Sequence, residues 1–262
     1  MGQHLHFNIL GPLDVVVDNR SVPIPVGKQR ILLAALLLKA NEIVPVDELI
    51  ERLWGQDLPC RPRSALHTYL TRLRHTLSEL CPGRAIRIHT SAAGYLLEVG
   101  AHDLDLIRFR QLLARARCAA DDNDRIREST ALTEALSLWR GPVLPDVRSD
   151  SLHRDVVPEI TEDWLRALDR FFELRLALGQ FDDLVGPLRV VTQKYPFHER
   201  LWQRFMLVLH RCGRRAEALA AYAELSDNMR AELGVDPSPE LRQLHVSMLR
   251  GEADSEYALS AR

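Results

Sequence analysis

The sequence predicts a mainly α-helical protein with a small amount of β structure, in which an N-terminal winged helix-turn-helix precedes an all-α domain of tetratricopeptide-like repeats. Two observations favour this fold. A basic amphipathic helix over Arg63–Leu80 leads into a β-hairpin over Ile86–Val99, which is the layout of a winged helix. Further on, the segments G-Q-F-D-D-L and G-R-R-A-E-A begin at Gly179 and Gly213, 34 residues apart, and that period is typical of tetratricopeptide repeats.

Short strands and helices are expected before the basic helix. Three apolar or alternating segments predict strands, and they are Leu5–Leu10, Leu13–Val17 and Ser21–Pro25. A leucine-rich helix is expected over Lys28–Ala40, and a second one over Val46–Trp54, which Gly55 ends. The proline-rich loop Gln56–Pro62 then leads to the third helix. With the hairpin, these elements make a first domain over residues 1–101.

The third helix divides into an apolar and a polar face at 3.6 residues per turn. The apolar stripe is Leu66, Tyr69, Leu70, Leu73, Leu77 and Leu80, and it is expected to pack on the first two helices. The opposite face holds Ser64, Thr68, Thr71 and His75, flanked by Arg61, His67, Arg72 and Arg74. Such a face suits a helix in the major groove, because Arg can bond guanine bidentately while Ser, Thr and His reach bases or phosphates. The pattern therefore predicts binding to double-stranded DNA.

The positive charge of the chain is concentrated in this region. Six arginines and Glu79 as the single acidic residue lie between Cys60 and His89, although the whole chain has a formal net charge of −2. A local patch of this kind, and not the total charge, is what binds phosphate. The alternative is a solvated helix face with no ligand. The hairpin that directly follows the helix favours DNA binding.

A helical second domain is expected over residues 102–250, and a disordered tail over residues 251–262. The predicted helices are Leu104–Ala120, Arg125–Arg140, Ser151–Leu178, Asp182–Tyr195, Glu199–Arg211, Ala216–Leu233 and Pro239–Leu249. Stacked helix pairs of this type form a concave surface for protein contact.

The sequence argues against an enzyme, a metal site and a cofactor. Gly27-Lys28 lacks the upstream glycine and the following Ser or Thr of a phosphate-binding loop, and no hydrolase or metalloprotease motif is present. His67 and His75 lie eight residues apart with no acidic or Cys partner, and His4 and His6 fit a solvated pair better than a metal site.

Composition indicates a cytoplasmic, nucleoid-associated protein with no membrane span. The four cysteines show no C-x-x-C spacing, which is simplest to explain as reduced thiols in a cytosol. The longest apolar run, Ile31–Leu38, is far too short to cross a bilayer.

The chain resembles the Streptomyces antibiotic regulatory proteins over nearly its whole length. The matching motifs in the first domain are F-N-I-L-G-P-L, G-K-Q-R-I-L-L-A-A-L-L-L, V-D-E-L-I-E-R-L-W-G, L-T-R-L-R and G-Y-L-L. Those in the second domain are L-W-R-G-P-V-L, G-R-R-A-E-A-L-A-A-Y and E-L-G-V-D-P-S-P-E-L-R-Q-L. The resemblance implies an OmpR-type winged helix joined to a bacterial transcriptional activation domain. It also implies an activator of a secondary-metabolite (antibiotic) gene cluster.

The resemblance implies particular DNA contacts. Arg72 matches the arginine that faces bases, and its neighbours Thr71 and Arg74 match base or phosphate contacts. Trp54 matches an indole that contacts the DNA backbone, although a tryptophan of the core fits the pattern equally well. Thr90 and Tyr95 match the wing. Where the family usually carries arginine in the wing, this chain has Ser91 and Leu96, which argues against readout of the minor groove by the wing, and His89 is the nearest cationic substitute.

The resemblance further implies a dimer bound head to tail on direct repeats near the −35 element, and recruitment of RNA polymerase holoenzyme through sigma region 4. The loop Gln56–Pro62 is the expected polymerase contact, through Gln56 and Asp57, because its prolines restrict the backbone and lower the cost of ordering on binding. A plain connector is the alternative. For the whole chain, the alternatives are a protein–protein adaptor built on the helical repeats and a winged-helix repressor.

Overall fold

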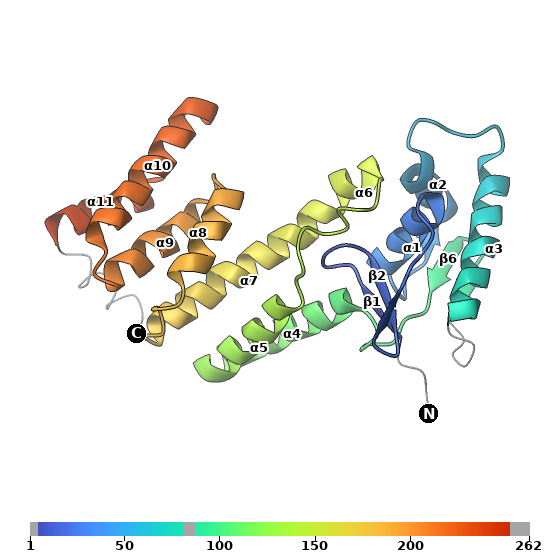
Figure 1. Ribbon diagram of the computed structural model, residues 1–262, viewed down its shortest axis with the longest axis horizontal. Coiled ribbons are helices and arrows are strands. Elements are labelled where there is room, and N and C mark those ends of the chain that lie inside the picture. The colour runs from blue at the N-terminus through green and yellow to red at the C-terminus, as the bar shows by residue number, and fades with distance from the viewer. Residues whose placement is uncertain (1–4, 81–86, 252–262) are drawn as a thin grey trace. The chain divides into compact units, whose positions relative to one another are not determined.

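The computed structural model describes residues 5–80 and 87–251, which divide into two compact units between Leu165 and Arg166. The boundary falls inside helix α7 (Val157–Ala177). The described residues contain two three-stranded sheets and are otherwise mainly helical, which confirms the predicted fold class (Figure 1). Ile86 of the predicted hairpin and residues 252–262 of the predicted disordered tail lie outside the described residues.

The first sheet is an antiparallel meander of β1 (Leu5–Asn8), β2 (Asp14–Val17) and β3 (Arg20–Val22). Asp18 and Asn19 both have positive φ, as a two-residue turn between twisted strands requires. The strands are shorter than predicted. The third ends at Val22 before a segment rich in proline, which lacks the backbone N–H that a sheet ladder needs.

Three helices follow and carry a second sheet. Helix α1 (Lys28–Leu38) is buried along its whole C-terminal two thirds, and α2 (Val46–Trp54) and α3 (Pro62–Leu80) pack against it. The second sheet has the order β4-β6-β5, made of β4 (Val44–Pro45), β5 (Ile88–Thr90) and β6 (Gly94–Leu97). Strand β4 was not predicted from the sequence, because two residues are too few to show a period.

Gly94 allows β4 to approach β6. A Cβ atom added at Gly94 would lie 2.0 Å from the Val44 carbonyl oxygen, so a side chain at this position would push the two strands apart. Gly94 pairs with Pro45, and Tyr95 pairs with Val44. The glycine of the G-Y-L-L motif is therefore required by the close contact of two strands that lie far apart in the sequence.

The remaining helices of the first unit are α4 (Asp105–Asp121), α5 (Arg125–Ser137), α6 (Asp150–Asp155) and the first part of α7. The prediction of one helix over Ser151–Leu178 was wrong, because the chain breaks at Val156 between α6 and α7. Pro158 explains the break, since proline lacks an N–H and its ring clashes with the preceding helical turn. The helix predicted to reach Arg140 ends at Ser137.

A buried carboxylate joins α4 to the first sheet. Asp105 accepts hydrogen bonds from the backbone N–H of Ile9 at 2.8 Å and of Leu10 at 2.8 Å, and from the N–H of Leu106 at 2.8 Å. These bonds take Ile9 and Leu10 away from β1, which explains why the strand ends at Asn8. Burial raises the pKa of the Asp105 carboxyl above its ordinary value, while the bonds from Ile9 and Leu10 act in the opposite direction.

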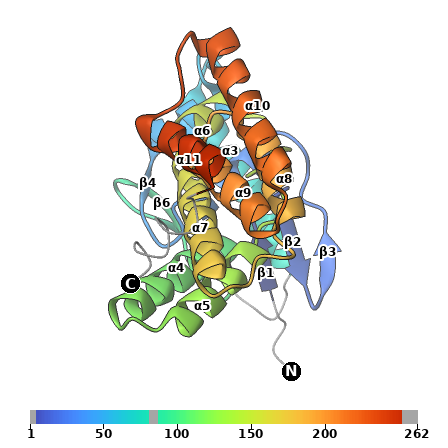
Figure 2. The same ribbon diagram turned by 90° about the vertical axis from the view of Figure 1, so that its left-hand side faces the viewer.

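The second unit consists of stacked helices. These are the C-terminal part of α7, α8 (Val185–Lys194), α9 (Glu199–Arg211), α10 (Arg215–Leu233) and α11 (Pro239–Arg250). Helix α9 packs against α8, α10 and α11, and Figure 2 shows α8, α9 and α10 beside one another. Gly213 adopts a positive φ of 73° between α9 and α10, which allows the tight turn of a helical repeat. The predicted helix–glycine–helix pattern is confirmed here.

Candidate DNA-binding surface

The exposed polar face of α3 lies opposite a buried leucine stripe, as predicted. Leu66, Leu70, Leu73 and Leu77 are buried, while Ser64, Thr68, Thr71 and His75 are exposed. The hydroxyls of Thr68 and Thr71 donate to the carbonyl oxygens of Ser64 and His67, each at 3.0 Å. A hydrogen bond from a Thr hydroxyl to a carbonyl of its own helix is weak, so each hydroxyl can exchange it for a bond to a ligand. We call the set Arg61, Ser64, Thr68, Thr71, Arg72 and His75 the α3 groove face.

Arginines stand at the edges of the α3 groove face. Arg61 and Arg72 are exposed, and the guanidinium carbon of Arg72 lies 5.8 Å from the centroid of the Tyr69 ring. A guanidinium in this position is held loosely over the ring, and its planar donors stay available for a bidentate contact. His75 lies 3.4 Å from Glu79, and both are largely exposed, so this pair is weak.

Trp54 lies where α2 meets α3, and it is half-buried. Its ring centroid is 6.1 Å from that of Tyr69, and the ammonium of Lys28 lies 6.0 Å above it. The Lys28 ammonium also donates to the Leu53 carbonyl oxygen. Sequence reasoning missed Lys28, because the residues it contacts lie in another helix and only the fold brings them together. Trp54 thus contributes to packing and keeps one part of its ring at the surface.

The wing is the hairpin of β5 and β6 with a tight turn at Ser91–Gly94. Ser91 and Gly94 exchange backbone hydrogen bonds of 2.9 and 3.3 Å across this turn. Thr90 is exposed and Tyr95 is half-buried. His89 Nε2 lies 2.9 Å from Glu98, and this hydrogen bond lowers the pKa of the Glu98 carboxyl. Because His89 is paired with an acid, it is a poor substitute for the missing wing arginine.

Arg74 does not project freely from α3. Its Nε and Nη2 donate to the Ile88 carbonyl oxygen at 3.2 and 2.7 Å, and Nη2 donates to Thr90 Oγ1 at 2.9 Å. Its guanidinium carbon also lies 6.0 Å from the centroid of the Tyr95 ring. The structure therefore brings Arg74, Thr90 and Tyr95 together at the junction between α3 and the wing.

The loop between α2 and α3 is exposed at Gln56, Asp57 and Leu58. It begins with a turn in which the Asp57 N–H donates to the Trp54 carbonyl oxygen at 3.0 Å. The Leu58 side chain is 55% exposed, which is unusual for a large apolar residue in a short connection. Sequence reasoning missed Leu58, and the only available signal was one leucine within a polar, proline-rich loop.

Helix α6 packs against the C-terminal end of α2. Arg52 donates to the Ser151 carbonyl oxygen at 3.0 Å and pairs with Asp155, and the Ser149 hydroxyl donates to the Arg52 carbonyl oxygen at 2.6 Å. Hydrogen bonds from Arg154 and Arg52 lower the pKa of the Asp155 carboxyl. These contacts link the end of α2 to a segment about a hundred positions away, so the start of the loop is anchored.

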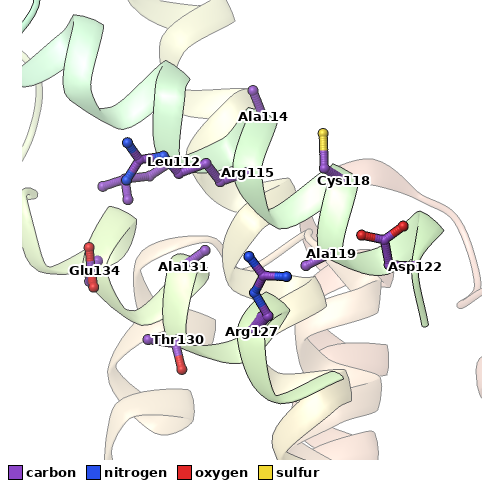
Figure 3. A pocket seen from close by; sticks show the side chains of 10 residues that line it. All are labelled: Leu112, Ala114, Arg115, Cys118, Ala119, Asp122, Arg127, Thr130, Ala131 and Glu134. Atoms are coloured by element: carbon purple, nitrogen blue, oxygen red, sulfur yellow. The ribbon is translucent and has the colours of Figure 1, made fainter. Parts of the chain in front are cut away.

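A groove lies between α4 and α5, separate from these residues. It has a volume of about 460 Å³, and Figure 3 shows Arg115 and Ala119 on α4 and Arg127 and Ala131 on α5. None of the residues that line it belongs to the α3 groove face or the wing. The described residues contain no cluster of His, Cys, Asp and Glu that could hold a metal ion, and none of their helices is long and apolar enough to span a membrane.

Two family models match the chain. The bacterial transcriptional activator domain matches residues 104–249, and the C-terminal domain of transcriptional regulatory proteins matches residues 26–97. Regulatory protein DnrI of Streptomyces peucetius is 33% identical over 254 residues, which cover 95% of this chain and 93% of DnrI. The chain belongs to the Streptomyces antibiotic regulatory protein family. The family resemblance read from the sequence motifs is thereby confirmed.

Longer relatives contain the same pair of modules. AfsR of Streptomyces griseus is 34% identical over 98% of this chain, which corresponds to 26% of AfsR. The solved structure of Mycobacterium tuberculosis EmbR, in complex with a low affinity phosphopeptide, superposes with a TM-score of 0.86 at 31% identity. That match covers 99% of this chain and 69% of the EmbR chain. The protein is a transcriptional regulator of this family, and neither matching model describes an enzyme.

Proposed function

We propose that this regulator is a sequence-specific activator that binds double-stranded DNA and turns on a secondary-metabolite gene cluster. The α3 groove face supports this most directly, because it combines small exposed hydrogen-bonding side chains with exposed arginines beside a wing. A solvated helix would need no such hairpin next to it. The similarity to DnrI and AfsR, which are regulatory proteins of Streptomyces, supports the role in transcription. No cofactor is required for this function.

Each element of the surface has a proposed role. Arg72 reads a guanine, and Arg61 contacts a phosphate at the N-terminal end of α3. Ser64, Thr68, Thr71 and His75 bond bases or phosphates from the exposed face of the helix. Trp54, through the exposed part of its ring, and Thr90 and Tyr95 in the wing contact the DNA backbone.

We further propose that two copies bind head to tail on direct repeats and recruit RNA polymerase through sigma region 4. Repeat centres about 10–11 bp apart, or a multiple of this, would place both copies on one face of the duplex. Gln56 and Asp57 of the anchored α2–α3 loop touch the polymerase. The exposed Leu58 supports a protein contact there, because exposed apolar side chains gain most from burial against a partner. Such a protein acts in the cytoplasm, on the nucleoid.

The domain boundaries proposed for this function are 1–101 for the DNA-binding module and 102–250 for the activation module. The short interval between the two matched models, from residue 97 to residue 104, supports a join at this position. Asp105 and Ser151 of the second module bond to Ile9 and Arg52 of the first, so the compact unit extends beyond the join.

The test begins with DNA selected from a random pool by the purified full chain. The selected site is then placed over the −35 element of a promoter and transcribed with a Streptomyces polymerase holoenzyme. We expect a direct repeat and increased transcription. Replacing both Gln56 and Asp57 with Ala should leave affinity for the site within about threefold, since the loop makes no base contact, while transcription falls toward the basal level.

The matched control is Glu42→Ala, which removes an exposed carboxylate elsewhere in the same module and should change neither property. Equal loss of affinity and transcription, or loss of neither, would exclude the loop as the polymerase contact. A palindromic site would exclude the head-to-tail arrangement. Binding that lowers transcription would identify a repressor, and a pool from which nothing is selected would leave the adaptor function.

A further inference from the structure

The carbonyl oxygen of Ile88 in the wing is not used by the hairpin ladder and faces α3. Ser91 and Gly94 form a hydrogen-bonded pair, and the Glu98 N–H donates to the Arg87 carbonyl oxygen at 3.0 Å. Ile88, which faces Leu97, therefore occupies a position whose own N–H and C=O point away from β6. Because β5 is the edge strand in the order β4-β6-β5, the Ile88 carbonyl has no neighbouring strand in this sheet to bond.

Arg74 satisfies this acceptor with a two-pronged contact. Both Nε and Nη2 of its guanidinium bond the Ile88 carbonyl oxygen, and Nη2 also reaches Thr90 Oγ1 two residues along the strand. The guanidinium lies near the ring of Tyr95 on β6 as well. One side chain of the recognition helix thus contacts both strands of the wing.

We propose that Arg74 is a positioning residue, which sets the distance and angle between α3 and the wing so that both reach the same DNA site. The proposal rests on the DNA-binding function above and gives Arg74 a role that differs from a base or phosphate contact. The two guanidinium nitrogens that bond the hairpin face the protein. Arg72, which is exposed on the other flank of the helix, keeps the role of base reader.

The geometry of the contact decides which substitution is informative. A phosphate contact needs mainly a positive charge, which lysine supplies. A bond from two nitrogens to one oxygen and a third bond to a hydroxyl need the planar fork of arginine, which a single ammonium cannot reproduce. Arg74→Lys therefore retains a phosphate contact but loses the positioning contact. Arg74→Ala removes the side-chain contact whether it is made to a phosphate or to the wing.

The experiment uses the full chain and a DNA site that the wild-type chain selects from a random pool. Affinity is measured by fluorescence anisotropy, and the position of each element on DNA by hydroxyl-radical footprinting. The nucleotides under the wing are those that lose protection in Ala92→Glu, which places an acid at the exposed wing turn. Arg63→Lys, an exposed arginine of the same helix, is the matched control and should bind like the wild type.

The expected result is that Arg74→Lys and Arg74→Ala both weaken binding by about tenfold, the scale of a lost charge-assisted hydrogen bond. Protection should disappear under the wing and persist under α3, whereas a general loss of folding would weaken both regions together. In the free protein, the amides of β5 and β6 should exchange faster with solvent in both variants. Thr90→Val, which removes one of the three bonds, should speed this exchange in the free protein less than Arg74→Ala does, and the two effects should not add.

Wild-type affinity and an unchanged footprint in Arg74→Lys would overturn the inference and assign Arg74 to a phosphate. A loss spread evenly over the whole site in Arg74→Ala would overturn it too. In either case the wild-type chain still binds its site, so the proposed function stands. A wild-type chain that selects no DNA would overturn both proposals.

Discussion

The first unit contains two groups of polar side chains that have different roles. In the seam between the first sheet and α4, the carboxylate of Asp105 is buried and accepts three backbone N–H bonds. On the α3 groove face, Ser64, Thr68 and Thr71 are exposed, and the hydroxyls of Thr68 and Thr71 bond to their own helix. Polar groups with fixed partners inside the chain hold the fold together, whereas exposed groups with weak local partners remain available to a ligand.

The seam continues beyond Asp105. The Arg140 N–H donates to the Leu10 carbonyl oxygen at 2.8 Å, and the Leu144 N–H donates to the Gly11 carbonyl oxygen at 2.8 Å. Gly11 is closely approached, because a Cβ there would lie 2.9 Å from the Cβ of Arg140. The loop between β1 and β2 is therefore bonded to Asp105 at the start of α4 and to the segment that follows α5. We expect variants of this seam to lose stability and variants of the α3 groove face to lose DNA affinity.

The largest effect is expected for Asp105→Ala. It leaves the buried N–H groups of Ile9 and Leu10 without their acceptor, and each such group costs about 1–3 kcal/mol. The free energy of unfolding of the first unit should fall by roughly 2–4 kcal/mol, which urea denaturation of the full chain would measure. Asp121→Ala, on the exposed end of the same helix, is the control and should change stability by less than about 0.5 kcal/mol. Equal stability of the two variants would refute the role of the seam.

Arg72→Ala is expected to lower DNA affinity and to leave stability unchanged. Losing a bidentate guanine contact should weaken binding to the selected DNA by about 1–3 kcal/mol and relax base preference at one position. The midpoint of thermal unfolding should stay unchanged, because the Arg72 side chain is exposed. Arg110→Ala, an exposed arginine of α4, should alter neither property. If Arg72→Ala bound with unchanged affinity, the docking of α3 in the major groove would be wrong.

The smallest expected effect is the dependence of stability on pH that Asp105 causes. Since burial raises the pKa of Asp105, the folded chain keeps a proton at acid pH that the unfolded chain has already released. Stability from this group is therefore full below the unfolded pKa and falls as the pH rises through the folded pKa. The slope is at most about 1.4 kcal/mol per pH unit. The free energy of unfolding is measured against pH for the wild type and for Asp105→Asn, and subtracting the second curve from the first isolates the contribution of the Asp105 carboxyl. A wild-type advantage that grows as the pH rises would contradict the raised pKa.

Periodicity and turn chemistry along the chain predicted most of the elements, although several of their ends differ in the structure. The leucine stripe of α3 is visible in the sequence because a helix repeats its faces every few residues, and the structure buries Leu66, Leu70, Leu73 and Leu77 as expected. The same signals predicted α1, α2 and the strands of the first sheet. The break at Val156 was missed although Pro158 marks it, because the apolar pattern continues from α6 into α7.

The sequence by itself determined most of the helices, the polar and basic face of α3 and the family, because these depend on the order and spacing of neighbouring residues. Only the tertiary structure decided where distant polar groups find partners. Asp105 bonds backbone groups of Ile9 and Leu10 across more than ninety positions, and Arg74 meets a carbonyl that a strand edge leaves free. Such contacts depend on the directions of single atoms after packing, which no pattern of residue types records. For this reason the sequence could name Arg74 but not the atoms it bonds.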